Sequence, residues 1–131
     1  MKEQLIEFET AKLAKEKGFG SVLSFPKCYD NGKLIKRPSF SSGSPTDYGD
    51  RFIAAPTQSL LQKWLRDEYG VYVTVIPDKS YDFGLLFNVV VKSDVEDYMY
   101  DLILRDGGKI MDLETYEQAL EAGLIEALKL I

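Results

Sequence analysis

The sequence predicts an α+β domain: a small antiparallel sheet of three to five strands, packed by a central and a C-terminal helix, with a helix and a hairpin at the N-terminal end. Two segments carry apolar residues at the three- and four-residue spacing of a helix face. Several others are rich in β-branched and aromatic residues, as strands are. A chain of 131 residues that is 45% hydrophobic has the size of one domain with one core. We therefore expect residues 1–131 to form a single domain.

The first expected element is a short helix within "TAKLAKEKGF" that ends at Gly18. Lys15 and Lys17 lie in its last turn, and glycine followed by Phe19 suits a left-handed cap with an apolar contact behind it. Residues 2–8 suit either an extension of this helix or an edge strand.

A hairpin is expected next, centred on Asn31-Gly32. This dipeptide lies between two extended stretches, and it is the strongest short hairpin signal in the chain because both turn positions tolerate a positive φ. Its strands are expected near 24–29 and 33–36.

Residues 37–52, "RPSFSSGSPTDYGDRF", are rich in Ser, Gly, Pro and Asp and have no helical or strand period. A loop of this length in a small domain is usually either functional or poorly ordered, and the sequence leaves both open. Its candidate interaction residues are Arg37, Tyr48, Asp50 and Arg51.

The central helix is expected to begin near Thr57, after Pro56, and to close at Gly70. Its apolar stripe consists of Leu60, Leu61, Trp64 and Leu65. Amides of the first turn, at Gln58 and Ser59, could hold an anion, but capping and packing already account for these residues. Trp64 is expected in the core, and an exposed ring would instead indicate an interaction site.

Three strands should follow, at 71–76, 82–92 and 97–105, the second of them central. The third alternates, with Tyr98 and Tyr100 on one face. A helix over 94–104 is the competing interpretation, because "SDVED" could cap one. Asp106-Gly107-Gly108 then predicts a tight turn into "KIMDL".

The last helix has the clearest periodicity. Thr115 and Gln118 have the spacing of a capping box. Gly123 costs about 1 kcal/mol relative to alanine in a helix interior, so its place on the apolar stripe predicts close approach to a sheet or another helix. The expected polar side carries Glu117, Glu121 and Glu126, and the expected apolar stripe carries Tyr116, Ala119, Leu120, Gly123, Leu124, Ala127, Leu128 and Ile131. Ile125 lies off that stripe and suggests a second contact surface.

Several chemistries are excluded by composition. The chain has no histidine and only one cysteine, Cys28, which removes Ser-His-Asp, Cys-His and His-based metal sites as well as an intrachain disulfide. No calcium-loop spacing, P-loop or dinucleotide fingerprint is present. We therefore assign no catalytic, cofactor-binding or metal-binding residues and expect no cofactor. A carboxylate cation site, and an enzyme that relies on carboxylates, tyrosines, lysines or Cys28, stay open as the least supported options. Cys28 should be a small buried apolar residue rather than a nucleophile.

The net charge of −5 disfavours general adhesion to nucleic acid or to an anionic membrane. No apolar run approaches the roughly 18 to 20 residues that span a bilayer, and the N-terminal residues lack the apolar core of a signal peptide. A cytoplasmic location is expected.

The segments "APTQSLLQKWLRDEYGVYVTV" and "TYEQALEAGLIEALKLI", with the earlier "ETAKLAKEKGF" and Cys28-Tyr29-Asp30, cover most of the chain. They resemble a family of small uncharacterised proteins that is common in phages and prophages of gut bacteria of the Bacteroides group. Members of that family join Pro-Thr-Gln-Ser, a leucine pair and Trp-Leu-Arg to a β segment and finish with a Tyr-Glu-x-Ala-Leu-Glu helix. Residues 77–112 depart most from the pattern. The resemblance implies a bacterial or phage cytosolic setting and brings no activity, ligand or catalytic residue.

Two functional hypotheses follow. The first is a small non-enzymatic accessory protein that binds another protein through an aromatic sheet face or the loop at 37–52. Further candidate interaction residues are Trp64 of the central helix and Tyr98 and Tyr100 of the third strand. The second is nucleic-acid binding, because a helix, three antiparallel strands and a helix over 57–131 share the outline of a double-stranded-RNA-binding domain. The acidic last helix disfavours the second hypothesis. The apolar last helix and Ile125 leave a homodimer open.

Overall fold

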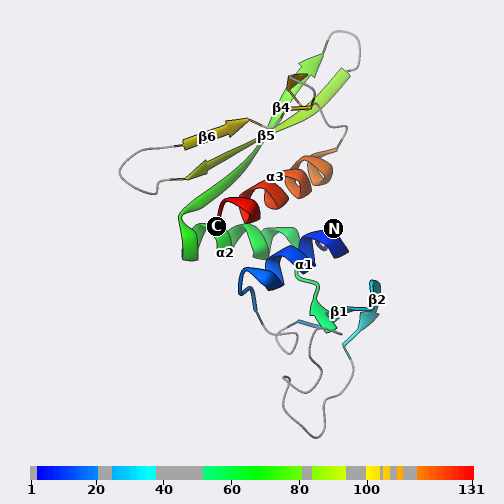
Figure 1. The fold of residues 1–131 in the computed structure, drawn as a ribbon. Coiled ribbons are helices and arrows are strands. Elements are labelled where there is room, and N and C mark those ends of the chain that lie inside the picture. The colour runs from blue at the N-terminus through cyan, green and yellow to red at the C-terminus, as the bar shows by residue number, and fades with distance from the viewer. Residues whose placement is uncertain are drawn as a thin grey trace, which may run out of the picture. The chain divides into compact units, whose positions relative to one another are not determined.

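The computed structural model of the chain describes residues 3–20, 25–37, 52–80, 84–93, 100–103, 105–106, 109–110 and 115–131. They confirm the α+β fold class, with helices and antiparallel sheets (Figure 1). The chain groups into two compact units, Met1–Thr57 and Gln58–Ile131, each with a three-stranded sheet of its own. The single domain expected over residues 1–131 stays a prediction.

Helix α1, Phe8–Glu16, ends in the left-handed cap expected from the sequence. Gly18 has a φ of 91°. Its amide donates a hydrogen bond to the Lys15 carbonyl, and the Phe19 amide donates one to the Ala14 carbonyl, both at 3.0 Å. These two bonds form a Schellman motif, which satisfies carbonyls that the helix leaves unpaired at its end.

The chain before α1 is extended and does not lengthen the helix. Leu5 forms an isolated antiparallel bridge with Thr57, and the Ile6 amide donates to the Pro56 carbonyl at 3.0 Å. Residues 3–7 therefore follow the edge-strand alternative more closely than the helical one, although no regular strand forms there.

The predicted hairpin is confirmed. Strand β1, Lys27–Asp30, pairs with β2, Lys33–Lys36, and the turn residues Asn31 and Gly32 have φ values of 50° and 86°. Strand β3, Phe52–Ala54, pairs with the other edge of β1 and was not predicted. It has only three residues, too few to show the alternation of a strand, and it begins at the end of the segment 37–52, which has no helical or strand period.

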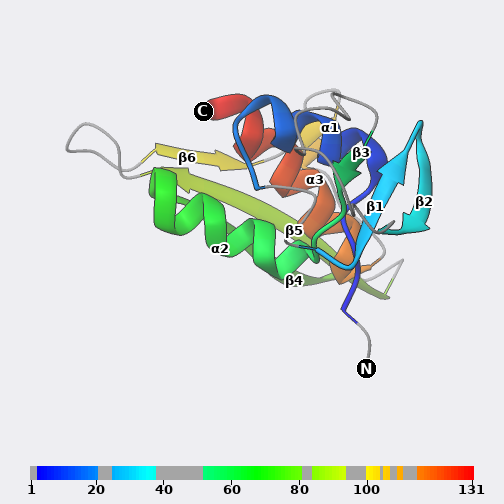
Figure 2. The same ribbon diagram turned by 90° about the horizontal axis from the view of Figure 1, so that it is seen from below.

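The second unit begins with helix α2, Gln58–Tyr69, which ends at Gly70 with a φ of 65°, as expected. Its sheet has the order β4-β5-β6, with all neighbours antiparallel, and Figure 2 shows β6 beside β5. The strands are β4, Val71–Ser80, β5, Gly84–Ser93, and β6, Tyr100–Ile103. A separate short pair consists of β7, Arg105–Asp106, and β8, Lys109–Ile110. Helix α3 spans Tyr116–Leu130.

The central place of β5 is confirmed, and so is a strand in the region where a helix over 94–104 was the alternative. That strand is shorter than the predicted 97–105, because β6 covers Tyr100–Ile103 and Arg105 belongs to β7. Gly107 and Gly108, where a tight turn is predicted, lie outside the described residues, and Asp106 pairs with Lys109.

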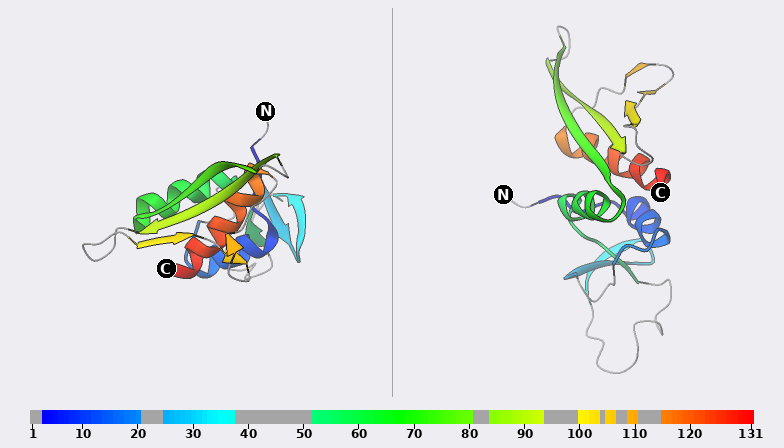
Figure 3. Two further views of the ribbon diagram at one scale, coloured as in Figure 1. Left: turned by 90° about the horizontal axis from the view of Figure 1, so that it is seen from above. Right: turned by 90° about the vertical axis from the view of Figure 1, so that its left-hand side faces the viewer.

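Helix α3 packs on β4 and β5, and helix α2 packs on β4 and on α3. The Thr115 side chain accepts the Gln118 amide at 3.1 Å, which confirms the N-cap. A Cβ atom added to Gly123 would lie 2.5 Å from a γ-methyl of Val89 and 2.6 Å from one of Val73. The predicted close approach is therefore to the sheet, and Figure 3 shows α3 running across one side of the β4–β5 ribbon.

Three expectations about the helix faces are wrong. Tyr116, expected on the apolar stripe of α3, is 47% exposed. Glu121, expected on the polar side of α3, is buried and accepts a hydrogen bond from the Gln58 side-chain amide at 3.1 Å. Leu60, expected on the buried stripe of α2, is 47% exposed. For Glu121 and Leu60 the reason is that the buried residues of α2 are Gln58, Leu61 and Leu65. This orientation brings the Gln58 side-chain amide to Glu121 on α3 and leaves Leu60 at the side of the buried face.

We expect Gly123→Ala to destabilise the protein, although alanine is the better helix former. The added methyl would push Val73 and Val89 out of their packing, and overpacking of this kind costs about 1–3 kcal/mol, more than the roughly 1 kcal/mol gained in helix propensity. Urea unfolding followed by circular dichroism measures the net change.

The neighbouring change Ala122→Gly is the control, because it alters helix propensity without the close contact. Removing one of the two obstructing side chains with Val89→Ala should make Gly123→Ala less costly than it is in the wild-type background. A Gly123→Ala variant more stable than the wild type would contradict the close packing of α3 on the sheet.

Candidate functional site

The candidate site is the side of the β4–β5–β6 sheet that faces away from α3. Side chains alternate between the two faces of a strand, and directly paired residues of antiparallel strands lie on the same face. Val73 pairs with Val91 and Val75 with Val89, and the row that contains them is the one Gly123 contacts. The opposite row, which we call the open sheet face, consists of Tyr72, Thr74, Ile76, Leu86, Asn88, Val90 and Lys92.

The two rows differ in burial near Gly123, although the row that α3 covers also includes the half-buried Val75 and Phe87 and the 57% exposed Leu85. Val71, Val73, Val89 and Val91 are all buried. On the open sheet face Tyr72 is 41% and Ile76 43% exposed, Thr74 is exposed, and the β5 residues are half-buried. Large apolar side chains that remain in water cost free energy unless a further surface covers them.

The open sheet face combines residues that favour a strand with residues that can contact a partner. The β-branched and aromatic residues Tyr72, Ile76 and Val90 favour the extended backbone of β4 and β5. Thr74 pairs with Val90, and Ile76 pairs with Asn88, so polar and apolar groups are interleaved across the two strands. Such a surface can bury apolar area against a partner while its hydroxyl and amide groups make hydrogen bonds.

The charge is divided unevenly between the two units. Residues 1–57 have nine Lys and Arg against seven Asp and Glu, whereas residues 58–131 have seven against fourteen. The unit that carries the open sheet face is therefore strongly acidic. Its field attracts basic partners and repels polyanions.

The exposed edge of β4 is partly protected. The Gln62 side-chain amide donates to the Val73 carbonyl at 2.7 Å, on the strand that ends the sheet. Edge carbonyls that find a partner within the chain are less able to recruit a foreign strand. Recognition at this site is therefore expected from the face rather than from the β4 edge near Val73.

The predicted interaction residues are dispersed. Trp64 on α2 is half-buried, and its ring lies edge-on to that of Tyr69 with centroids 5.1 Å apart. Arg37 belongs to the other unit, where it directly follows β2, is exposed, and has its amide bonded to the Pro26 carbonyl. Tyr100 begins β6 opposite Ser93, so its position belongs to the row that includes Val71 and not to the open sheet face. Tyr48, Asp50, Arg51 and Tyr98 lie outside the described residues.

Sequence reasoning missed Ile76, Leu86 and Val90. Alternation in "VYVTVI" does separate two rows of side chains, but it does not say which row α3 covers. Gly123 in the apolar stripe of α3 was the signal in the sequence that this helix approaches the sheet closely. Only the three-dimensional contact identifies Val73 and Val89 as the residues it approaches.

Catalytic chemistry finds little support among the described residues. They contain no group of three or more His, Cys, Asp or Glu side chains that could hold a metal ion. Cys28 is fully buried, and burial, followed by the nearby Asp30 carboxylate, raises the pKa of its thiol, only partly offset by Arg37. A nucleophilic cysteine needs the opposite, a lowered pKa and an accessible sulfur.

Helices of the described part of the chain are all too short or too polar to cross a membrane. Comparison with protein families, with curated protein sequences and with solved structures gives no match for the chain.

We expect Cys28 to react slowly with iodoacetamide in the folded protein at pH 8, and quickly once urea unfolds it. Because its pKa is raised on folding, the stability that the protonated thiol contributes is complete below its unfolded pKa, near 9, and is lost as the pH rises toward the folded value. Mass spectrometry of the alkylated protein follows the reaction, and the unfolded chain provides the reference rate. Equal rates in the two states would show that the thiol is accessible.

Proposed function

We propose that this protein is a small non-enzymatic accessory protein that acts by binding another protein through the open sheet face. The observation that carries the proposal is the exposure of Tyr72 and Ile76 on the side of the sheet opposite the buried Val71, Val73, Val89 and Val91. The partner has an apolar contact area surrounded by Lys and Arg, because the unit that carries the face has twice as many acidic as basic residues.

The setting we propose is the cytoplasm of a bacterium, with the protein of a phage or prophage type. The support for this is the resemblance of the Pro-Thr-Gln-Ser and C-terminal helix motifs to the family described above, together with the lone, buried Cys28.

The role of the open sheet face in partner binding can be tested by placing a charge on this face. Ile76→Lys puts an ammonium group on the open sheet face, where it repels a basic partner and removes apolar contact. Leu60→Lys is the matched control, because Leu60 has nearly the same exposure, 47% against 43%, lies in the same unit, and is on α2.

Each chain is immobilised and exposed to a lysate of a Bacteroides host, and bound proteins are identified by mass spectrometry. We expect the wild type and Leu60→Lys to retain the same basic protein, and Ile76→Lys to retain about tenfold less, since a few contact residues typically carry most of an interface's binding energy. Circular dichroism confirms that all three chains are folded. Equal retention by Ile76→Lys, or a second copy of this chain as the protein retained, contradicts the proposal.

Nucleic-acid binding is the second candidate, supported by the order α2, β4, β5, β6, α3, which has the helix–three strands–helix outline of a double-stranded-RNA-binding domain. Fold outline alone is weak support for function. At the end of α3 the Lys129 ammonium lies 3.3 Å from the Glu126 carboxylate, and Glu117 is exposed at its start. Phosphate binding needs basic groups in such places. Salt-dependent retention of duplex RNA would favour this candidate over protein binding.

A further inference from the structure

A cleft of about 920 Å³ lies within the unit Met1–Thr57, between helix α1, the turn of the β1–β2 hairpin and strand β3. This volume is in the range of small-molecule sites, roughly 300–1,000 Å³. Nothing in the proposed function uses the cleft, because the open sheet face belongs to the other unit.

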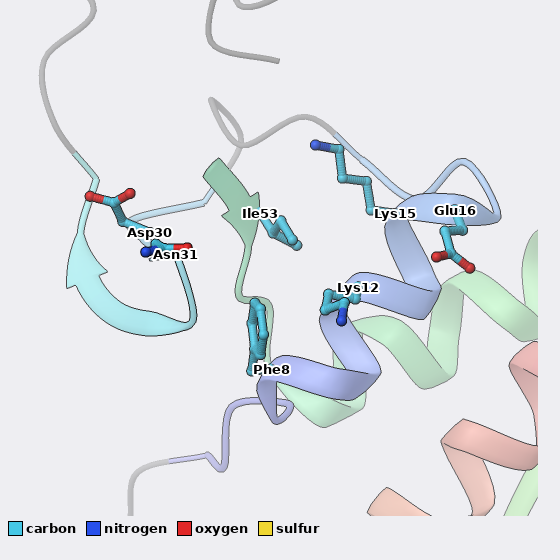
Figure 4. A pocket seen from close by; sticks show the side chains of 7 residues that line it. All are labelled: Phe8, Lys12, Lys15, Glu16, Asp30, Asn31 and Ile53. Carbon is cyan, nitrogen blue, oxygen red and sulfur yellow. The ribbon is translucent and has the colours of Figure 1, made fainter. Parts of the chain in front are cut away.

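The cleft has an apolar centre made by Phe8 of α1 and Ile53 of β3 (Figure 4). The Phe8 ring is fixed from behind: its centroid is 5.4 Å from that of Tyr29, whose hydroxyl donates to the buried Ile6 carbonyl at 2.6 Å. A Cβ on Gly32 would lie 3.6 Å from the same ring, so the hairpin turn rests against it. The apolar centre is therefore formed before any ligand arrives, which lowers the entropic cost of binding.

The two sides of the cleft carry opposite charge. Lys12 and Lys15 extend from α1 on one side, and Asp30 and Asn31 lie at the hairpin turn on the other (Figure 4). The Lys12 ammonium is 5.3 Å from the centroid of the Phe8 ring, so an anion bound by this lysine lies beside the apolar centre. Lys12 is also 3.6 Å from Glu9, but both side chains are largely exposed, and such a pair is weak and easily exchanged.

Glu16 also lines the cleft, at the C-terminal end of α1. In Figure 4 it lies at the end of the helix remote from Phe8, whereas Lys12 lies next to Phe8 and Ile53. The group nearest the apolar centre on the helix side is thus a cation, and the groups on the hairpin side are a carboxylate and an amide.

From this arrangement we propose that the cleft binds a short zwitterionic peptide, two or three residues long, with a large apolar side chain. The peptide carboxylate binds the lysine side, its ammonium group binds Asp30 and Asn31, and its side chain packs on Phe8 and Ile53. Charge-assisted hydrogen bonds at both ends fix its direction, and the apolar contact supplies the remaining affinity. A single free amino acid has its two charges on one carbon and does not separate them across an apolar centre.

The test uses the full chain and the dipeptide Leu-Phe as probe, followed by isothermal titration calorimetry. Two altered probes, the N-acetylated dipeptide and the C-terminal amide, each remove one charge. We expect each alteration to weaken binding to the wild type about tenfold.

Two variants test which side of the cleft binds the ammonium end of the peptide and which binds the carboxylate end. Asp30→Asn should bind the N-acetylated and free peptides almost equally while still preferring the free carboxylate. Lys12→Met should bind the C-terminal amide and the free peptide almost equally while still preferring the free ammonium group. Lys12→Arg should retain most of the preference for the carboxylate. A loss of folding would remove both preferences together, and thermal unfolding of each variant detects it directly.

Absence of binding by Leu-Phe at millimolar concentration to the folded wild type would overturn the proposal. So would equal binding of all three probes, or preferences that Asp30→Asn and Lys12→Met leave unchanged. Tight binding of the N-acetylated probe would show that the cleft takes apolar anions rather than zwitterions. None of these outcomes bears on partner capture by the open sheet face, which is measured with different variants.

Discussion

The second unit depends on how closely α3 approaches the sheet at Gly123. With no side chain at this position, the γ-methyls of Val73 and Val89 reach the helix backbone. The neighbouring contact positions Ala119 and Ala127 are also small and completely buried, so the helix can lie close to the strands along its length. Dense packing of this kind gives each buried atom more neighbours and makes the interior intolerant of added volume.

This constraint also creates the open sheet face. Strand alternation allows only one row of β4 and β5 side chains to reach α3, and Val71, Val73, Val89 and Val91 occupy that row. The other row then has to face away from the helix, whatever its composition. The threonine, asparagine and lysine in this row are polar residues of the kind expected on a strand face in contact with water. Tyr72 and Ile76 are different, because contact with water does not favour large apolar side chains and threonine would satisfy strand propensity equally well. Their size is the reason to connect this row with a partner.

Local features were predictable from the sequence because local interactions determine them. Gly18 and Gly70 end their helices, Asn31-Gly32 turns the hairpin, and Thr115 caps α3, each through bonds or dihedral angles within a few residues. Glu121 was misassigned because its hydrogen-bond partner, Gln58, lies 63 residues earlier, and no period in α3 indicates that contact. Likewise, the cleft in the first unit joins α1 to β3, a three-residue strand that has no sequence signature.

The Pro-Thr-Gln-Ser segment shows how a conspicuous motif can serve structure alone. Pro56 is buried and its carbonyl accepts the Ile6 amide, while Gln58 donates to both Glu121 and the Glu117 carbonyl. The Gln58 side chain therefore links the start of α2 to α3. The same reasoning applies to the outline shared with double-stranded-RNA-binding domains: topology places α3 beside the sheet, but side chains decide what it recognises. In α3 three acidic residues, Glu117, Glu121 and Glu126, accompany the one lysine, Lys129, and this balance disfavours binding of a phosphate.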